Sequence, residues 1–243
     1  MNPTAPTAAE PCVWMAAGLV NYKLCDHDFD CTRCPLDVAL RGGGFASADA
    51  GFLPGRHRRG EGFPEDRRYA TGHTWVARRS RSGAPVVRVG VDSFAAALLP
   101  YPVRARSVEG PRTFRRGDVI CDIELNEGTL SVRAPLSGRL KRGNPALVAQ
   151  PGLIVESPYR DGWLVDLVPT DAEAPGDELV DADAARLRAS AHLRSFRRNI
   201  ALHLLKDMPA VGPCLPDGGE ALTNLSEILG GALYLRILRE VLR

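Results

Sequence analysis

The chain has 243 residues and a formal net charge of +2 at pH 7, from 31 Lys and Arg against 29 Asp and Glu. Hydrophobic residues make up 44% of it and charged residues 25%. This composition is that of a globular protein and excludes wholesale disorder or a fibrous structure. The near-neutral charge gives no global argument for nucleic acid or an anionic membrane as partner.

The sequence shows no apolar run near the roughly 20 residues that a membrane-spanning helix needs. Its first residues have neither the basic nor the apolar part of a secretory signal. We therefore expect a cytoplasmic protein that contacts no membrane. Thiols are reduced in that compartment, so the six cysteines are interpreted as metal ligands or buried apolar side chains rather than as three disulfides.

Four of the cysteines crowd the segment 1–42, with the spacing Cys12-x12-Cys25-x5-Cys31-x2-Cys34. A C-x-x-C pair lets two thiolates bind one metal from a tight loop, and two further cysteines complete a tetrahedron. We expect a metal knuckle that holds zinc or, alternatively, an iron–sulfur cluster, because thiolates stabilise both. Two alternatives stay open: the thiols are core residues or a redox dithiol without metal, or His27 replaces Cys12 as fourth ligand.

A segment rich in Gly, Pro and Arg follows over residues 43–67 and is interpreted as a flexible linker, because it has too little apolar surface to offset ordering. A short basic run at residues 56–59 lies in this linker. Such a run is usually solvated. We therefore expect no nucleic-acid partner.

Residues 68–170 consist of short β-rich runs separated by turn signals. The predicted elements are, in chain order, strands over 73–79 and 84–91, a helix over 92–99, a hairpin over 119–134 and a strand over 163–167. The hairpin is predicted because apolar residues alternate with polar ones on both sides of Asn126-Glu127-Gly128. Cys121 falls on the apolar phase of its strand and is predicted to lie in the core.

An acidic segment over residues 171–183 is interpreted as a second linker. Beyond it, apolar residues recur at helical spacing, at Leu187, Ala191, Phe196, Ile200 and Leu204. Two further helices are predicted over 222–229 and 232–242. We expect a small helical bundle over residues 184–243, which either packs on the strands or forms a homodimer.

Several short stretches of the central segment carry a resemblance to a known family. They are His73-Thr74-Trp75-Val76, Val89-Gly90-Val91-Asp92-Ser93-Phe94, Ala134-Pro135-Leu136-Ser137-Gly138, Asn144-Pro145-Ala146-Leu147, Pro151-Gly152-Leu153-Ile154 and Ser157-Pro158-Tyr159-Arg160-Asp161-Gly162-Trp163-Leu164. In this order they resemble the glycine cleavage system H protein family, the lipoyl carrier of that complex, over roughly 100 residues, a typical domain length. The resemblance implies a mainly β fold with helices, built on a barrel-sandwich hybrid, the flattened barrel of two sheets that lipoyl and biotinyl domains share.

The resemblance also implies that lipoate is attached to a lysine at a hairpin tip, eight positions before the proline of the Pro-x-Ser-Gly turn. Counted back from Pro135, that position is Glu127. Attachment as an amide needs a primary amine, which a carboxylate does not supply. Lysine occurs only at Lys23, Lys141 and Lys206. We therefore expect no lipoate and assign no cofactor-binding residue.

The sequence contains no Ser/His/Asp, phosphate-loop or HExxH constellation, so we predict no catalytic residue and no catalysis of the protein's own. Our hypothesis is a metal-stabilised interaction or adaptor protein on an H-like scaffold, whose partner is a redox or one-carbon enzyme. Two alternatives stay open: an H-type carrier protein of glycine cleavage, and an iron–sulfur redox carrier or sensor. The roles of Cys214 and Glu127 also stay open.

Overall fold

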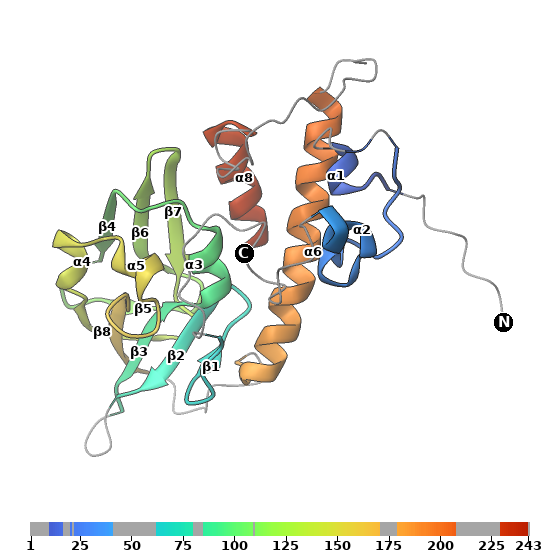
Figure 1. Cartoon of the computed structure of the whole chain (residues 1–243). Coiled ribbons are helices and arrows are strands. Elements are labelled where there is room, and N and C mark those ends of the chain that lie inside the picture. The colour runs from blue at the N-terminus through green and yellow to red at the C-terminus, as the bar shows by residue number, and fades with distance from the viewer. Residues whose placement is uncertain are drawn as a thin grey trace. The chain divides into compact units, whose positions relative to one another are not determined.

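A computed structural model of the chain describes residues 10–16, 20, 22–40, 62–79, 85–108, 110–170, 179–207 and 229–242. The chain divides into two compact units, one of residues 1–53 and 190–223, the other of residues 54–189 and 224–243 (Figure 1). The helical region predicted over 184–243 is therefore shared between the units. Most of the linker predicted over 43–67, most of the helix predicted over 222–229, and Cys214 lie outside the described residues.

The second unit holds the described strands, which pair in two antiparallel sheets of order β1-β2-β3-β9-β8-β5 and β4-β6-β7. The strands are β1 (Arg68–Tyr69), β2 (Thr74–Arg78), β3 (Val87–Val91), β4 (Arg104–Ser107), β5 (Thr113–Phe114), β6 (Val119–Leu125), β7 (Gly128–Arg133), β8 (Gly138–Gly143) and β9 (Val165–Pro169). The helices of this unit are α3 (Ser93–Leu98), α4 (Ala146–Ala149), α5 (Leu153–Glu156), α8 (Gly231–Val241) and the first residues of α6 (Ala182–Asp207).

The mainly β fold with helices is confirmed, and the described part of the chain forms two antiparallel sheets that do not close into a barrel. Both sheets are open, because β7 ends the smaller sheet and no described strand pairs with its outer edge. Side chains of the last helix, α8, contact this hairpin instead. One example is Leu235, which approaches Gly128 at the start of β7.

The two sheets bury one common core. Val89 and Leu167 of the larger sheet and Ile123 of the smaller sheet belong to one cluster and are inaccessible to solvent. The alternation predicted along β6 is interrupted by a β-bulge between Val119 and Cys121. Because a bulge places an extra residue in one strand, both Ile120 and Cys121 are fully buried. The core position predicted for Cys121 is thus confirmed.

The helix predicted over 92–99 is α3, which is one residue shorter at each end because residues 92 and 99 are its caps. Asp92 is its N-cap: the carboxylate Oδ1 accepts a hydrogen bond from the Ala95 amide at 2.9 Å. The other carboxylate oxygen lies 2.9 Å from Nδ1 of His73, and both side chains are buried. One carboxylate therefore satisfies an orphan amide of the helix and a buried imidazole together.

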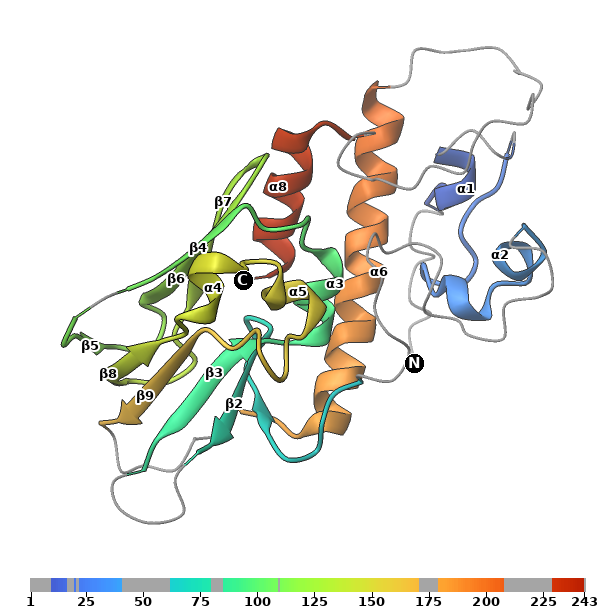
Figure 2. The same ribbon diagram turned by 60° about the vertical axis from the view of Figure 1, so that its left-hand side comes forward.

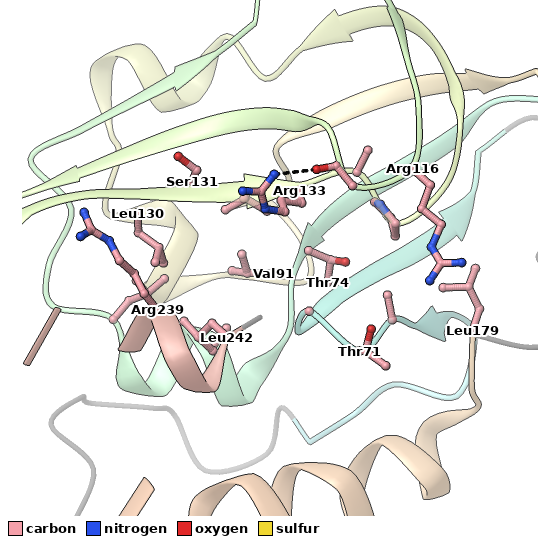
Figure 3. A pocket seen from close by; sticks show the side chains of 18 of the residues that line it. Thr71, Thr74, Val91, Arg116, Leu130, Ser131, Arg133, Leu179, Arg239 and Leu242 are labelled. Carbon is pink, nitrogen blue, oxygen red and sulfur yellow. Dashed lines mark hydrogen bonds between the residues drawn. The ribbon is translucent and has the colours of Figure 1, made fainter. Parts of the chain in front are cut away.

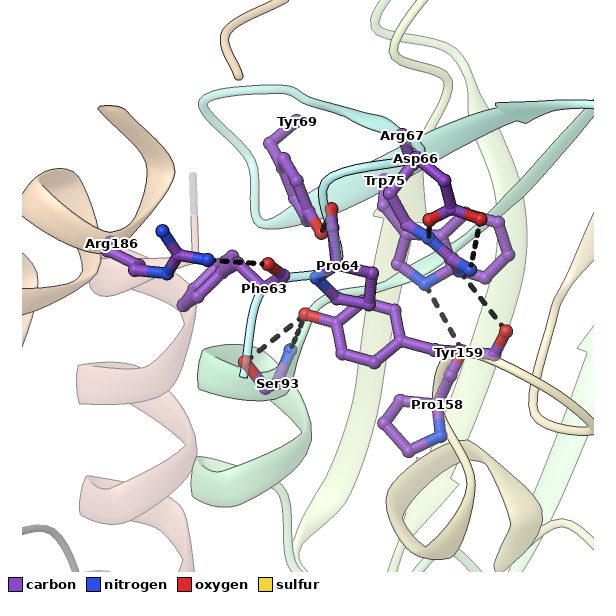
Figure 4. A network of polar contacts seen from close by, with 10 residues as sticks. All are labelled: Phe63, Pro64, Asp66, Arg67, Tyr69, Trp75, Ser93, Pro158, Tyr159 and Arg186. Carbon is purple, nitrogen blue, oxygen red and sulfur yellow. Dashed lines mark hydrogen bonds and ion pairs between the residues drawn. The ribbon is translucent and has the colours of Figure 1, made fainter. Parts of the chain in front are cut away.

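A network of polar and ring contacts joins segments far apart in the sequence (Figure 4). The indole Nε1 of Trp75 donates to the Pro158 carbonyl at 3.1 Å, and the guanidinium of Arg67 stacks 4.5 Å above the Trp75 ring. The hydroxyl of Tyr159 accepts from the Ser93 amide at 2.9 Å. These contacts fix the segment after α5 to β2 and to the start of α3, which brings together residues on which the family resemblance rests.

The first unit contains α1 (Val13–Ala16), a 3-10 helix (Cys31–Arg33), α2 (Pro35–Leu40) and the rest of α6. One described apolar cluster of this unit consists of Val13, Ala16 and Phe29 with Cys25 packed against them, and Phe196 and Ile200 of α6 are also fully buried. None of the helices in the described ranges is both long enough and apolar enough to cross a membrane.

Candidate functional site

The β6–β7 hairpin ends in a tight turn, as predicted. Leu125 pairs with Gly128, so Asn126 and Glu127 form the two-residue tip. Gly128 has φ of +134°, a conformation that residues with a Cβ rarely adopt. The position at which the family resemblance implies a lipoyl lysine is therefore the tip of the hairpin, and Glu127 occupies it.

Helix α8 covers this tip (Figure 2). A Cβ on Gly231, the first residue of α8, would lie only 2.5 Å from Cγ of Glu127. A Cβ on Gly128 would lie 2.8 Å from Cδ2 of Leu235, one turn further along the helix. Glycines at these two positions allow the helix and the hairpin to approach closely. The Glu127 side chain is consequently packed against the helix and only partly exposed.

The carboxylate of Glu127 lies in an unusual environment for a tip residue. Its Oε2 atom is buried and has no hydrogen-bond partner among the described residues. A negative charge beside the first turn of α8 is favourable, because the helix dipole is positive there. Burial, with the charge of Glu127 as a smaller cause, also raises the pKa of the Tyr234 phenol above its ordinary value.

Further contacts hold α8 against the strand-rich unit. The Tyr234 hydroxyl donates to the Leu98 carbonyl at the end of α3, at 2.6 Å. Arg239 Nη2 donates to the Thr129 carbonyl on β7, at 2.7 Å. Ile237 and Leu238 are fully buried. The helix is thus a built part of this unit and not a loose tail.

Of the three lysines, only Lys141 belongs to the same unit as this tip. Lys141 is exposed and belongs to β8 of the larger sheet. Lys23 belongs to the other unit, where its ammonium pairs with Asp26 at 2.8 Å. Lys206 lies in the part of α6 that belongs to the same unit as Lys23.

The four predicted metal ligands are brought around one small cavity of the first unit. Cys12, Cys25, Cys31 and Cys34 all line this cavity of about 10 Å³, and all are free thiols. The Phe29 amide donates to Sγ of Cys25 at 3.1 Å. Among the described residues, however, no three His, Cys, Asp or Glu side chains form a group that could hold a metal ion.

The surroundings of Cys31 in this cavity favour its neutral thiol. Burial is the main cause that raises the pKa of the Cys31 thiol to about 11; the charge of Arg197 opposes the rise, and Asp37, Cys12 and Cys25 add smaller contributions to it. His27 also lines the cavity. A metal would have to displace the proton from Cys31, as any thiolate ligand requires.

A groove of about 720 Å³ lies beside β7 in the strand-rich unit (Figure 3). Arg116, Arg133 and Arg239 line it. Sequence analysis missed this groove and the packing of α8 on Glu127. The glycine pair 230–231 predicts the start of a helix. The local sequence does not predict the element against which that helix packs.

Comparison with known proteins concerns the strand-rich unit. Residues 67–191, about half of the chain, match the family model described as glycine cleavage H-protein. The chain is 32% identical over 120 residues to the glycine cleavage system H protein of Micrococcus luteus. This alignment covers 49% of this chain and 91% of the relative. It is 33% identical over 126 residues to the glycine cleavage system H protein of Mycobacterium avium, and that alignment covers 51% of this chain and 93% of the relative.

A crystal structure of a glycine cleavage system H protein from Mycobacterium marinum aligns with 30% identity over 50% of this chain and 94% of that protein, with a TM-score of 0.44. The motifs expected for an H protein lie in the matched residues, which include the hairpin that ends in Glu127. This chain belongs to the glycine cleavage H-protein family.

Proposed function

We propose that this protein is a non-catalytic, protein-binding member of the H-protein family that carries no lipoate at its hairpin tip. The proposal rests on the residue at the hairpin tip and on the helix that is packed against it. Glu127 stands at it, and the first turn of α8 is packed against its side chain. A carboxylate forms no amide with lipoic acid, and a covered tip offers no freely moving side chain.

The partner we propose is an enzyme of one-carbon or redox metabolism that recognises H-type surfaces. Support comes from the family match, because the relatives are glycine cleavage system H proteins and the alignment spans more than nine tenths of their length. Surfaces outside the tip therefore remain available for docking. Binding through such surfaces needs no catalytic residue in this chain.

The test is binding without lipoylation. The full chain would be produced with and without a lipoate ligase, and its binding to the glycine cleavage enzymes of its own organism would be measured by calorimetry. We expect the same affinity for both preparations and no lipoyl mass on either. An unlipoylated H protein that is known to bind serves as the positive control. Binding that appears only after ligase treatment contradicts the proposal.

A second candidate function is an H-type carrier protein, which the family match favours at the level of the whole domain. The chain could serve this function through the exposed Lys141 on β8. Peptide mass spectrometry of ligase-treated protein decides between the two. Lipoyl mass on Lys141 that disappears in Lys141→Arg would establish the carrier function and overturn our first proposal.

We also propose that Cys12, Cys25, Cys31 and Cys34 bind zinc or, alternatively, an iron–sulfur cluster of a redox carrier or sensor. Support comes from their placement around one cavity and from the amide that donates to Cys25. Bound metal would add to the folding free energy of this unit.

The metal proposal is tested by metal analysis and visible absorption of protein purified without oxygen. We expect one equivalent of zinc in colourless protein, or iron and sulfide in brown protein. Cys31→Ser should lose the metal. Cys121→Ala, which removes a buried thiol of the strand-rich unit, is the matched control and should keep it. Metal-free natural protein, or equal metal in Cys31→Ser, contradicts the four-thiolate site.

A further inference from the structure

One end of the larger sheet carries a cluster of exposed cations. Strand β5 ends this sheet and β8 lies next to it (Figure 2). Arg139, Lys141 and Arg142 of β8 are all exposed. Arg112 is exposed as well, and its carbonyl accepts a hydrogen bond from the Leu140 amide at 2.8 Å, which places Arg112 beside the same strand. These four cations are called the basic edge below.

A β-bulge in β8 brings two of these cations to the surface. Leu140 pairs with Leu167 and Arg142 pairs with Asp166, so Lys141 is the extra residue between them. In a regular strand, Arg142 would lie on the same side as Leu140, which belongs to the core. Because the bulge shifts this alternation by one residue, Lys141 and Arg142 are both exposed although they are consecutive.

Arg142 is held in place and still has donors to offer. Its Nε donates to Asp166 Oδ2 at 2.9 Å, and its guanidinium lies 5.2 Å from the centre of the Trp163 ring. The Arg142 side chain is nevertheless 58% exposed. A guanidinium has five N–H donors, and nothing in the described ranges accepts from the terminal nitrogens of Arg142. Because the side chain is already ordered, binding an anion through these donors costs less entropy.

The positive charge of the basic edge is not compensated within the described part of the chain. Asp166 is buried, and both of its carboxylate oxygens already accept hydrogen bonds from arginines. No described Asp or Glu pairs with Arg112, Arg139 or Lys141. Like charges that lie close together repel one another, whereas they attract a surface of opposite charge. The cluster is therefore suited to binding an anionic partner rather than to stabilising the fold.

We propose that the basic edge is the docking surface for an acidic segment of the partner protein, whose Asp and Glu side chains pair with Arg139, Lys141 and Arg142. This inference rests on the proposed docking function and names the surface that performs it. Guanidinium groups bind carboxylates through paired hydrogen bonds. Trp163, the ring on which Arg142 lies, is only 7% exposed. It offers no platform for stacked bases, on which single-stranded nucleic acids depend, so a protein is the favoured partner.

The first experiment measures binding of a labelled octaglutamate peptide to the full chain by fluorescence anisotropy. Arg139→Glu combined with Lys141→Glu should weaken this binding at least about tenfold, because two attractive contacts become repulsive. The control is Arg68→Glu combined with Arg78→Glu, which reverses two exposed arginines of β1 and β2, at the other end of the same sheet.

The control pair changes the net charge by the same amount as the first pair. It should weaken peptide binding much less, because exposed charges more than about 10 Å from the peptide are largely screened in about 0.1 M salt. Equal weakening by the two pairs overturns the proposal. So does a lack of octaglutamate binding by the natural chain at millimolar peptide.

Other occupants of the basic edge are outcomes of the same experiment. Octathymidylate, a single-stranded DNA of the same number of units, should bind more weakly than octaglutamate, and equal or tighter binding overturns the choice of a protein partner. This chain also has carboxylates in its acidic segment, and a variant that combines Asp171→Asn, Glu173→Gln, Asp177→Asn and Glu178→Gln should bind the peptide as the natural chain does. Peptide binding that appears only in this variant overturns the proposal, because these carboxylates would then be the occupants.

The second experiment separates this inference from the docking function. Calorimetry with the glycine cleavage enzymes of the same organism should show that Arg139→Glu with Lys141→Glu weakens enzyme binding at least about tenfold and that the control pair does not. Unchanged enzyme binding by the first pair overturns the basic edge as docking surface and leaves the docking function standing. A natural chain that binds none of the enzymes overturns the docking function, and the peptide experiment then decides whether the basic edge binds acidic segments.

Circular dichroism checks that each variant is folded. If the charge-reversed pair at Arg139 and Lys141 fails to fold, Arg139→Gln combined with Lys141→Gln takes its place, because it removes both charges without adding repulsion. This pair should weaken octaglutamate binding about threefold. Unchanged peptide binding by this folded variant overturns the proposal.

Discussion

At the residue scale, single carboxylates do much of the structural work in this protein. Glu127 is packed against the start of α8, Asp92 caps α3 and binds His73, and Asp166 lies between two arginines. An orphan amide meets Asp92 and two arginines meet Asp166, whereas Oε2 of Glu127 is buried with no hydrogen-bond partner among the described residues. Asp92 and Asp166 therefore contribute to stability in a way that a substitution can measure.

Asp92→Ala should destabilise the strand-rich unit by about 2–3 kcal/mol, because it removes the helix cap and leaves the buried His73 without this carboxylate. Asp92→Asn is the control, since its amide oxygen can still accept from the Ala95 amide at the start of α3. Urea unfolding followed by circular dichroism gives both values. A loss below about 0.5 kcal/mol for Asp92→Ala, against the range typical of lost caps, contradicts the role given to this carboxylate.

Asp166 should make stability depend on pH in the acid range. Burial alone would raise the pKa of its carboxyl, but hydrogen bonds from Arg88 and Arg142 outweigh burial and hold the pKa below its ordinary value. The unfolded carboxyl titrates near pH 3.9, so the stabilisation is complete well above that pH and is lost as the pH falls through the lower folded pKa.

Asp166→Asn removes this titration. Its free energy of unfolding should be lower than that of the natural protein at pH 7, and the difference should shrink as the pH is lowered below about 4. Unfolding curves collected from pH 7 to pH 3 measure the trend. A difference that grows in acid contradicts the lowered pKa of Asp166.

At the level of single helices and strands, the sequence predicts the secondary structure of a segment better than it predicts the element against which that segment packs. The hairpin tip, the cap of α3 and the helix that follows Gly230 all follow from local patterns of glycine, capping residues and apolar spacing. The bulge beside Cys121 does not, because the sheet must accommodate an extra residue that alternation alone does not reveal. The packing of α8 on the hairpin depends on glycines at positions 128 and 231, distant in the sequence.

The covering of the tip by α8 predicts the behaviour of a variant with a lysine there. Glu127→Lys restores the amine, yet a lipoate ligase should modify it poorly, because α8 is packed against the tip. Adding Leu235→Asp, which places a charge in the helix–hairpin contact, should loosen α8 and raise the modified fraction. Intact mass after co-expression with the ligase reports both fractions.

Glu127→Gln, which has no amine, is the control for modification elsewhere and should gain no mass. Complete lipoylation of Glu127→Lys alone would show that α8 does not shield the tip. An increase in Glu127→Lys combined with Leu235→Asp, seen without an increase for Leu235→Asp by itself, would assign the effect to the hairpin tip.

At the scale of the whole molecule, family membership and the β-rich fold could be read from ordered motifs, because these residues meet in the folded unit. Trp75 and Tyr159, for example, come from stretches that are distant in the sequence, and their rings lie 6.0 Å apart. The division into units could not be read so well. It places α8 with the strands and most of α6 with the cysteines, an arrangement set by tertiary contacts that composition does not encode.

We propose above all that the hairpin tip carries no lipoate. The intact mass of the natural chain, co-expressed with a lipoate ligase and supplied with lipoate, tests this directly. We predict the mass of the bare polypeptide, or of the polypeptide with metal only. An H protein that bears the tip lysine, expressed in the same cells, is the control and should be fully modified. A lipoyl mass on the natural chain would contradict the proposal that this protein carries no lipoate, and peptide mapping would show which lysine carries it.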